Sequence, residues 1–136
     1  VIYSDYNQYK NSSTPLSELL RDSDIVSVHV PLNETTLDLI RSKELRSMKK
    51  TALLINTSRG GVVNEKDLYE CLANECIKGA AIDVFANEPY SGELIELKNI
   101  ILTPHIGAYS RESRQIQEQQ ALRNLIKGLG LESWRP

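Results

Sequence analysis

Three residues of this sequence carry a cation, a carboxylate and an imidazole next to short apolar runs: Arg59, Glu88 and His105. A planar guanidinium suits bidentate binding of a carboxylate. A carboxylate beside an imidazole favours the protonated ring, which suits proton transfer near neutral pH. Taken singly, the three residues fit a solvated loop cation, a surface acid and a structural histidine. Together they predict a catalytic site for an acidic small molecule.

Each of the three residues follows a segment that is typical of a buried parallel strand. Arg59 follows the strand expected at 51–56, Glu88 the strand at 79–83 and His105 the strand at 99–102. Because ligands of open α/β sheets bind beyond the carboxyl ends of the strands, we expect the three side chains at one such edge. The glycines after Arg59, Gly60-Gly61, would let a ligand approach the backbone closely.

Two further strands are expected at 1–3 and 25–30, and helices separate the strands. The helix caps are expected at Thr14 (with Pro15 as the first helical residue), Ser42 and Asn64, and a long helix begins near Ser110. The apolar positions of that helix have the spacing of one buried face: Leu122, Leu125, Ile126 and Leu129. Strands alternating with helices predict an α/β fold with a doubly wound parallel sheet, Rossmann-like.

The expected sheet is incomplete relative to the six-stranded dinucleotide fold. No Gly-x-Gly-x-x-Gly motif occurs in the 136 residues, so the Gly-rich loop, the first strand and the first helix are missing from the pattern. Asp5, at the end of the first expected strand, is placed to accept hydrogen bonds from a ribose and to disfavour a 2′-phosphate. It therefore favours NAD over NADP, although it could equally be a solvated acid at a strand end.

The composition is that of a soluble globular protein, with 40% hydrophobic residues, 25% charged residues and a formal net charge of −2. It gives no reason to expect a nucleic acid or a membrane as partner. No signal peptide is expected, and Cys71 and Cys76 fit reduced packing thiols of a cytoplasmic protein. His29 and His105 lie too far apart for a local metal-ligand pair, so no metal is expected, and we assign His29 a structural role inside its strand. No Gly-x-Ser-x-Gly elbow supports a serine hydrolase.

Three segments together resemble the D-isomer-specific 2-hydroxyacid dehydrogenases, with phosphoglycerate dehydrogenases as the nearest branch. The Arg motif is LLINTSRGGVV (53–63), the Glu motif is GAAIDVFANEP (79–89) and the His motif is LTPHIGA (102–108). A fourth segment, VHVPL (28–32), is similar to the strand before the nicotinamide pocket. The order and spacing of the motifs agree over nearly the whole chain up to about residue 130.

The resemblance implies a role for each matching residue. Arg59 would bind the substrate carboxylate, His105 would be the general acid/base, and Glu88 would orient His105. Asp83 would hold the nicotinamide carboxamide. The resemblance implies NAD as cofactor, a 2-hydroxy or 2-oxo acid as substrate, and these cofactor-binding residues: Asp5, Val30, Pro31, Thr57, Ser58, Arg59, Asp83, His105, Gly107 and Ala108.

The same resemblance suggests how the chain is organised. Residues 1–108 would form part of an NAD-binding domain, and residues 109–136 would form a helix and tail that return toward a substrate domain. A homodimer is expected for the parent protein. Two alternatives stay open, namely a nucleotide-sensing protein related to transcriptional corepressors and a fragment that is inactive alone. Without the Gly-rich loop, we expect at most weak NAD binding by the 136 residues themselves.

Overall fold

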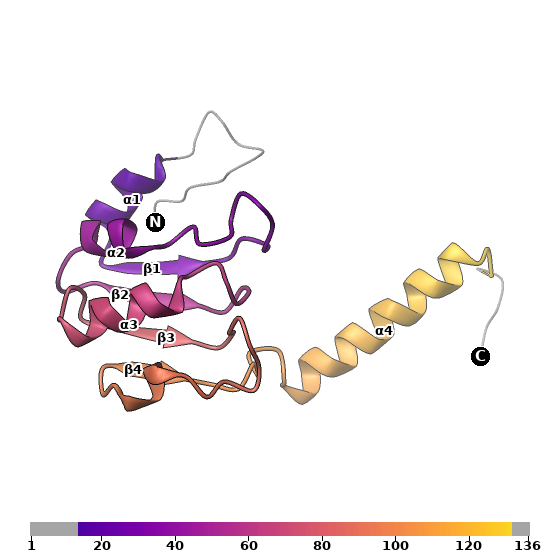
Figure 1. Cartoon of the computed structure of the whole chain (residues 1–136). Helices are drawn as coiled ribbons and strands as arrows, with labels where there is room; N and C mark the ends of the chain where they lie inside the picture. The colour runs from indigo at the N-terminus through magenta and orange to yellow at the C-terminus, as the bar shows by residue number, and fades with distance from the viewer. Residues whose placement is uncertain (1–13, 132–136) are drawn as a thin grey trace. The chain divides into compact units, whose positions relative to one another are not determined.

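Four parallel strands form the sheet of this chain in a computed structural model that describes residues 14–131 (Figure 1). They lie side by side in chain order: β1 (Ile25–Val28), β2 (Leu53–Asn56), β3 (Gly79–Ile82) and β4 (Ile100–Leu102). Val26 lies opposite Leu54, which lies opposite Ala80. The parallel α/β sheet predicted from the sequence is confirmed. The strand expected at 1–3 lies outside the described residues.

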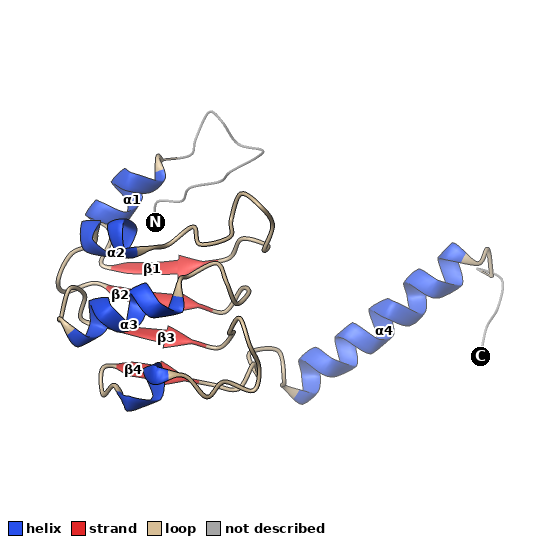
Figure 2. Cartoon of the chain, viewed as in Figure 1, coloured by secondary structure: helices blue, strands red, loops and turns tan. Residues whose placement is uncertain are grey.

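All helical connections of the sheet lie in one layer (Figure 2). α1 precedes β1, α2 and α3 connect the first three strands, and the 3₁₀-helix η1 precedes β4. Neighbours in this series contact one another, in the order α1 (Leu16–Asp22), α2 (Ser42–Ser47), α3 (Glu65–Ala73) and η1 (Glu93–Glu96). Right-handed crossovers that all step in one direction place every connection on the same face. The described sheet is thus one half of a doubly wound arrangement.

The two faces of the sheet differ in burial. Side chains that point toward the helices form the core, and Val26, Leu54 and Ile82 are at most 6% exposed. Alternate residues on the opposite face stay accessible, and Ile25 is 60% and Ile101 66% exposed. The strands therefore have the burial pattern of a sheet covered on one side.

Two helix starts differ from the sequence prediction. Pro15 has an extended ψ of 139° and is itself the cap, so α1 begins at Leu16 and not at Pro15. α2 is capped by Arg41, because Ser42 already lies inside the helix and donates its N–H to Oδ2 of Asp67 at 2.7 Å. The cap at Asn64 is confirmed, since its Oδ1 accepts the Asp67 N–H at 3.0 Å.

β1 ends two residues before the predicted boundary. His29 lies past the end of the strand, is exposed, and hydrogen-bonds through Nε2 to the Ser27 hydroxyl at 2.8 Å. Its assignment to the interior of a strand was therefore wrong. The parallel ladder with β2 stops at the pair Val28–Asn56, because the chain after Asn56 turns away from the sheet into the loop that carries Arg59.

The chain divides into two compact units, Val1–His105 and Ile106–Pro136. The second contains α4 (Arg111–Gly128), which begins near Ser110 as predicted, and the Ser110 hydroxyl caps it by accepting the Ser113 N–H at 3.0 Å. No residue of α4 is buried, so the buried face predicted for Leu122 and its partners was wrong. Among the described residues of this unit, 106–131, no second helix or strand packs against α4. In the described part of the chain, no helix combines the length and apolar content needed to cross a membrane.

α3 ends in a Schellman motif. The Glu75 N–H donates to the Leu72 carbonyl at 3.1 Å and the Cys76 N–H donates to the Cys71 carbonyl at 2.9 Å. Glu75 has a φ of +53°, the left-handed conformation in which glycine is preferred because a Cβ crowds the backbone there. The turn between α3 and β3 is thus strained at one residue.

We predict that Glu75→Gly raises the free energy of unfolding by about 0.5–1 kcal/mol, because glycine removes the Cβ strain at positive φ. Urea titration followed by circular dichroism measures this. The matched control is Glu70→Gly in the exposed middle of α3, which should lower the same quantity by about 1 kcal/mol. Equal losses in both variants would contradict the strain at Glu75.

Candidate active site

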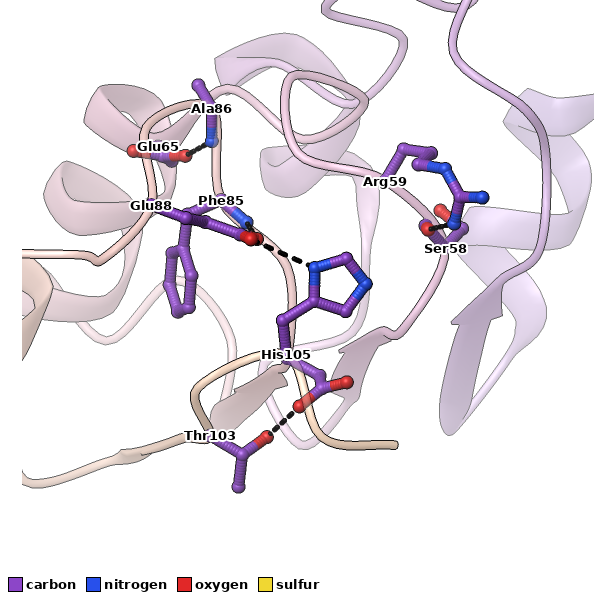
Figure 3. Close-up of polar contacts among 9 residues, drawn as sticks. Ser58, Arg59, Glu65, Phe85, Ala86, Glu88, Thr103 and His105 are labelled. Carbon is purple, nitrogen blue, oxygen red and sulfur yellow. Dashed lines mark hydrogen bonds and ion pairs between the residues drawn. The ribbon is translucent and has the colours of Figure 1, made fainter. Parts of the chain in front are cut away.

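The loops after β2, β3 and β4 carry Arg59, Glu88 and His105 (Figure 3). Because the three strands are parallel and adjacent, all three loops leave the same edge of the sheet. Figure 3 shows the His105 ring between the Glu88 loop and the side on which Arg59 lies. The carboxylate and the imidazole touch, whereas the guanidinium belongs to a separate loop.

Glu88 holds the imidazole through one nitrogen. Nδ1 of His105 lies 2.9 Å from Oε2 of Glu88, and the second carboxylate oxygen accepts the Phe85 N–H at 3.0 Å. With Nδ1 occupied, Nε2 is the nitrogen directed away from Glu88 (Figure 3). Such a contact fixes the orientation of the ring and leaves Nε2 to exchange a proton with a ligand.

The same contacts keep Glu88 ionised. The hydrogen bond from His105, followed by the backbone N–H of Phe85, holds the pKa of the Glu88 carboxyl below its ordinary value of 4.5. Both side chains remain accessible, with 49% of His105 and 37% of Glu88 exposed. The negative charge is therefore present at neutral pH, and the pair is open to solvent.

A second carboxylate anchors the loop that carries His105. The Thr103 hydroxyl donates to Oδ1 of Asp83, which is only 5% exposed, and the Thr103 N–H donates to the Ile82 carbonyl at 3.0 Å. His105 itself has a φ of +54°, and its N–H donates to the Thr103 carbonyl at 3.0 Å. A tight turn tied to β3 thus presents the imidazole at the edge.

Asn56 shapes the loop that carries Arg59. This last residue of β2 is 1% exposed, and its Oδ1 accepts both the N–H of Ser58 at 3.1 Å and the Ser58 hydroxyl at 2.8 Å. Its Nδ2 donates to the Arg59 carbonyl at 3.2 Å. The Arg59 side chain is exposed, and Nη1 donates to the Ser58 carbonyl at 2.6 Å. The guanidinium is therefore folded onto its own loop, and a carboxylate ligand would compete with that single contact.

Gly60 and Glu65 join the Arg59 loop to the Glu88 loop. A Cβ on Gly60 would lie 2.0 Å from the carbonyl carbon of Phe85, so only glycine allows this approach. Glu65, the first residue of α3, accepts the Ala86 N–H at 2.7 Å (Figure 3). The close approach that we predicted for Gly60 and a ligand is thus made to protein backbone.

The other predicted site residues fall into three groups. Val30 is half-buried, Pro31 and Thr57 are exposed, and Ser58 is buried with its hydroxyl bonded to Asn56, all within the first unit. Asp5 lies outside the described residues. Two residues belong to the second unit, namely Gly107 and Ala108. Among the residues that the structure describes, no group of three or more His, Cys, Asp and Glu side chains is arranged to hold a metal ion.

The sequence analysis missed Asn56 and Glu65. Each carried a local signal: Asn56 is a polar residue at an inward position of a strand, and Glu65 is an acid in the first turn after an N-cap. Neither signal shows which group the side chain binds. Asn56 bonds to Ser58 and Arg59 in the loop that follows it, and Glu65 bonds to Ala86, 21 positions away.

Comparison with known proteins identifies the family of this chain. The family profile described as "D-isomer specific 2-hydroxyacid dehydrogenase, NAD binding domain" matches residues 1–107. The chain belongs to this family. Residues 1–107 contain Arg59, Glu88 and His105, and the NAD-binding function of the domain agrees with the open edge at the carboxyl ends of the strands.

Individual relatives agree with the family. The chain is 49% identical over 115 residues to a glyoxylate reductase of Thermofilum pendens, covering 83% of this chain and 34% of that protein. It is 46% identical over 114 residues to a glyoxylate reductase of Korarchaeum cryptofilum, covering 82% and 34%. The chain thus spans about a third of the length of the curated relatives that it matches.

Solved structures share the fold. An NAD-complexed D-isomer-specific 2-hydroxyacid dehydrogenase from Lactobacillus delbrueckii ssp. bulgaricus matches with a TM-score of 0.77 at 31% identity, covering 91% of this chain and 42% of that one. An acyclic imino acid reductase in complex with NADPH and D-Arg matches with a TM-score of 0.85 at 33% identity, covering 93% and 42%. The sheet is therefore Rossmann-like, and NAD is the cofactor of this domain family.

The Glu88–His105 contact predicts a pH-dependent stability. Because folding lowers the pKa of Glu88, its stabilising effect is complete above the ordinary value of 4.5 and is lost as the pH falls through the folded pKa. We expect the melting temperature of Glu88→Gln to lie below that of the unchanged chain at about pH 6, with the difference shrinking below the ordinary pKa. The control is Glu96→Gln at one of the two exposed acids of η1, and its difference should not vary with pH. A Glu88→Gln difference that is constant with pH would show that the carboxylate gains nothing from its partners.

Proposed function

We propose that the protein containing this domain is an NAD-dependent oxidoreductase that interconverts a D-2-hydroxy acid and its 2-oxo acid. The observation that carries the proposal is the 2.9 Å contact between Glu88 and Nδ1 of His105, at the carboxyl edge of an NAD-binding domain of this family. An imidazole held in this way at a cofactor edge suits proton transfer to and from a substrate oxygen. The neighbouring loop supplies a guanidinium for the substrate carboxylate.

The side chains of this chain have separate parts in the proposed reaction. In reduction, Nε2 of His105 donates a proton to the C2 oxygen of the oxo acid, and in oxidation it takes that proton back. Glu88 stays ionised and fixes the ring through Nδ1. Arg59 leaves its contact with the Ser58 carbonyl to bind the substrate carboxylate and to meet negative charge on the oxygen. NAD(H), when bound, accepts or supplies the hydride at C2.

The residues at this edge fit the nicotinamide end of the cofactor. Asp83 is a buried carboxylate at the end of β3, beside the turn that presents His105, and can accept from a carboxamide. We assign Val30, Pro31 and Thr57 to the same end and Asp5 to the ribose. Because the 136 residues contain no Gly-x-Gly-x-x-Gly motif, residues beyond them would hold the pyrophosphate.

The substrate class follows from the relatives and the charges of the site. A small 2-oxo acid such as glyoxylate is the substrate class that we favour. Two relatives are glyoxylate reductases, and the guanidinium of Arg59 can bind the carboxylate of such an acid. A phosphoglycerate dehydrogenase-like specificity is the finer proposal from the motifs. The free thiols of Cys71 and Cys76 fit a cytoplasmic enzyme, and the family resemblance suggests a homodimer.

The direct test is turnover by the intact protein. We expect it to reduce a 2-oxo acid from a panel that includes glyoxylate and 3-phosphohydroxypyruvate, with a higher kcat/KM for NADH than for NADPH. The carboxylate of Asp5 should repel the 2′-phosphate of NADPH. Initial rates, followed by the absorbance of NADH or NADPH, give the turnover of each 2-oxo acid and kcat/KM with each cofactor. No turnover of any 2-oxo acid would refute the proposed function, and a preference for NADPH would refute only the role of Asp5.

Variants of the acid–base pair test the mechanism. His105→Ala should lower kcat by about 10²- to 10⁴-fold, the usual contribution of a positioned proton donor, with little change in the dissociation constant of NADH. Glu88→Gln should mainly shift the pH profile of kcat, because it removes the carboxylate that contacts Nδ1 of His105. Glu96→Gln should leave both quantities unchanged. A pH profile of Glu88→Gln that matches the unchanged enzyme would separate Glu88 from the proton transfer.

A further inference from the structure

The two cysteines meet at the end of α3. Cys71 lies in the last turn of the helix, and Cys76 follows the left-handed Glu75. The Cys76 N–H donates to the Cys71 carbonyl at 2.9 Å, and the side chains of these two Schellman positions commonly contact each other. Here both of these positions carry a free thiol. An apolar contact would satisfy the motif equally well, so the sulfur pair adds chemistry that the helix end does not need.

The surroundings of the two thiols differ. Cys71 is 2% exposed, and burial followed by the hydrogen bond with Cys76 raises its pKa to about 12, so it keeps its proton. Cys76 is only partly buried, and Nη1 of Arg46 lies 3.7 Å from its sulfur. An accessible sulfur beside a guanidinium is typical of reactive cysteines. Cys76 is therefore the thiol that an oxidant can reach, and the buried Cys71 is the thiol that can react with the oxidised Cys76.

We propose that Cys71 and Cys76 form a thiol oxidation site, at which a peroxide converts the pair into an intramolecular disulfide. The site is separate from the proposed active site. α3 begins at Glu65, which bonds to the Glu88 loop, whereas the cysteines lie at its other end, just before β3 begins at Gly79. The proposal therefore does not depend on dehydrogenase activity.

The reaction balances in two steps. The Cys76 sulfur attacks one peroxide oxygen, the O–O bond breaks, and Cys76 becomes a sulfenic acid while one water leaves. The Cys71 sulfur then attacks the Cys76 sulfur, the S–OH bond breaks, and the thiol proton leaves with the hydroxyl as a second water. Both thiols are oxidised, and the peroxide is reduced to two waters. A cytosolic dithiol can reverse the step by thiol–disulfide exchange.

The experiment treats the reduced 136-residue chain with hydrogen peroxide, alkylates the remaining thiols and measures the intact mass and the linked peptides. We expect a monomer that has lost two hydrogen atoms, takes up no alkylating reagent and yields a Cys71–Cys76 cross-linked peptide. Dithiothreitol should restore both thiols. Circular dichroism before treatment establishes that each sample is folded.

Three variants assign the parts of the site. Cys71→Ser should leave Cys76 as a sulfenic acid that dimedone traps, whereas Cys76→Ser should leave the buried Cys71 unoxidised. Arg46→Gln should slow disulfide formation by roughly two- to fivefold, the modest effect of an exposed charge. The control is Lys43→Gln, which removes another exposed cation of α2, the helix that carries Arg46. This variant should form the disulfide at the unchanged rate.

Several results would overturn the proposal. Full alkylation of both cysteines after peroxide treatment would show that the pair is inert. Disulfides between chains, or a Cys71–Cys76 disulfide that forms only in denaturant, would show that the folded helix end does not bring the sulfurs together productively. Equal rates for Arg46→Gln and Lys43→Gln would remove the guanidinium from the site.

Discussion

The approach of two backbones at Gly60 is the constraint on which the candidate site depends. The loop of Arg59 and the loop of Glu88 leave different strands, and they meet where a Cβ on Gly60 would overlap the Phe85 carbonyl. Glu65 closes the same junction by accepting the Ala86 N–H. Since Glu88 also bonds to the Phe85 N–H, a shift of the Gly60 backbone would pass to the carboxylate and from there to the His105 ring. Positioning thus resides in main-chain contacts around the charged groups.

The exposure of the acid–base pair explains why such a framework is needed. With 49% of His105 and 37% of Glu88 exposed, water screens their attraction, and a surface contact of this kind contributes only modestly to stability. The pair alone cannot hold its own geometry. The turn that Thr103 ties to β3 positions His105, and the hydrogen bond from the Phe85 N–H positions Glu88. Enclosing the pair would strengthen the same interaction, because lower local polarity reduces the screening.

The sequence predicted the parallel strands and the loops that carry the polar residues, because apolar runs and their Gly and Pro boundaries are local signals. It misplaced the cap of α2, whose first N–H is satisfied by Asp67, 25 residues away in the chain. The close approach predicted between Gly60 and a ligand is made to the Phe85 backbone for the same reason. A glycine in a sequence shows that a close approach is allowed but does not show which group approaches. The prediction of a buried face on α4 failed for a different reason, since its apolar spacing is regular but the described residues of its unit include no other helix or strand to cover it.

α3 links the two sites of the first unit while keeping them apart. Its first residue, Glu65, supports the Glu88 loop, and its last turn carries Cys71 beside Cys76. Nine helical residues span about 13 Å, and the Asn64 cap and the Schellman turn hold the two ends independently. A disulfide between Cys71 and Cys76 would restrain a turn that is already formed, at the end remote from Glu65. Oxidation should therefore act on the stability of the connection between α3 and β3 and leave the geometry of Glu88 and His105 in place.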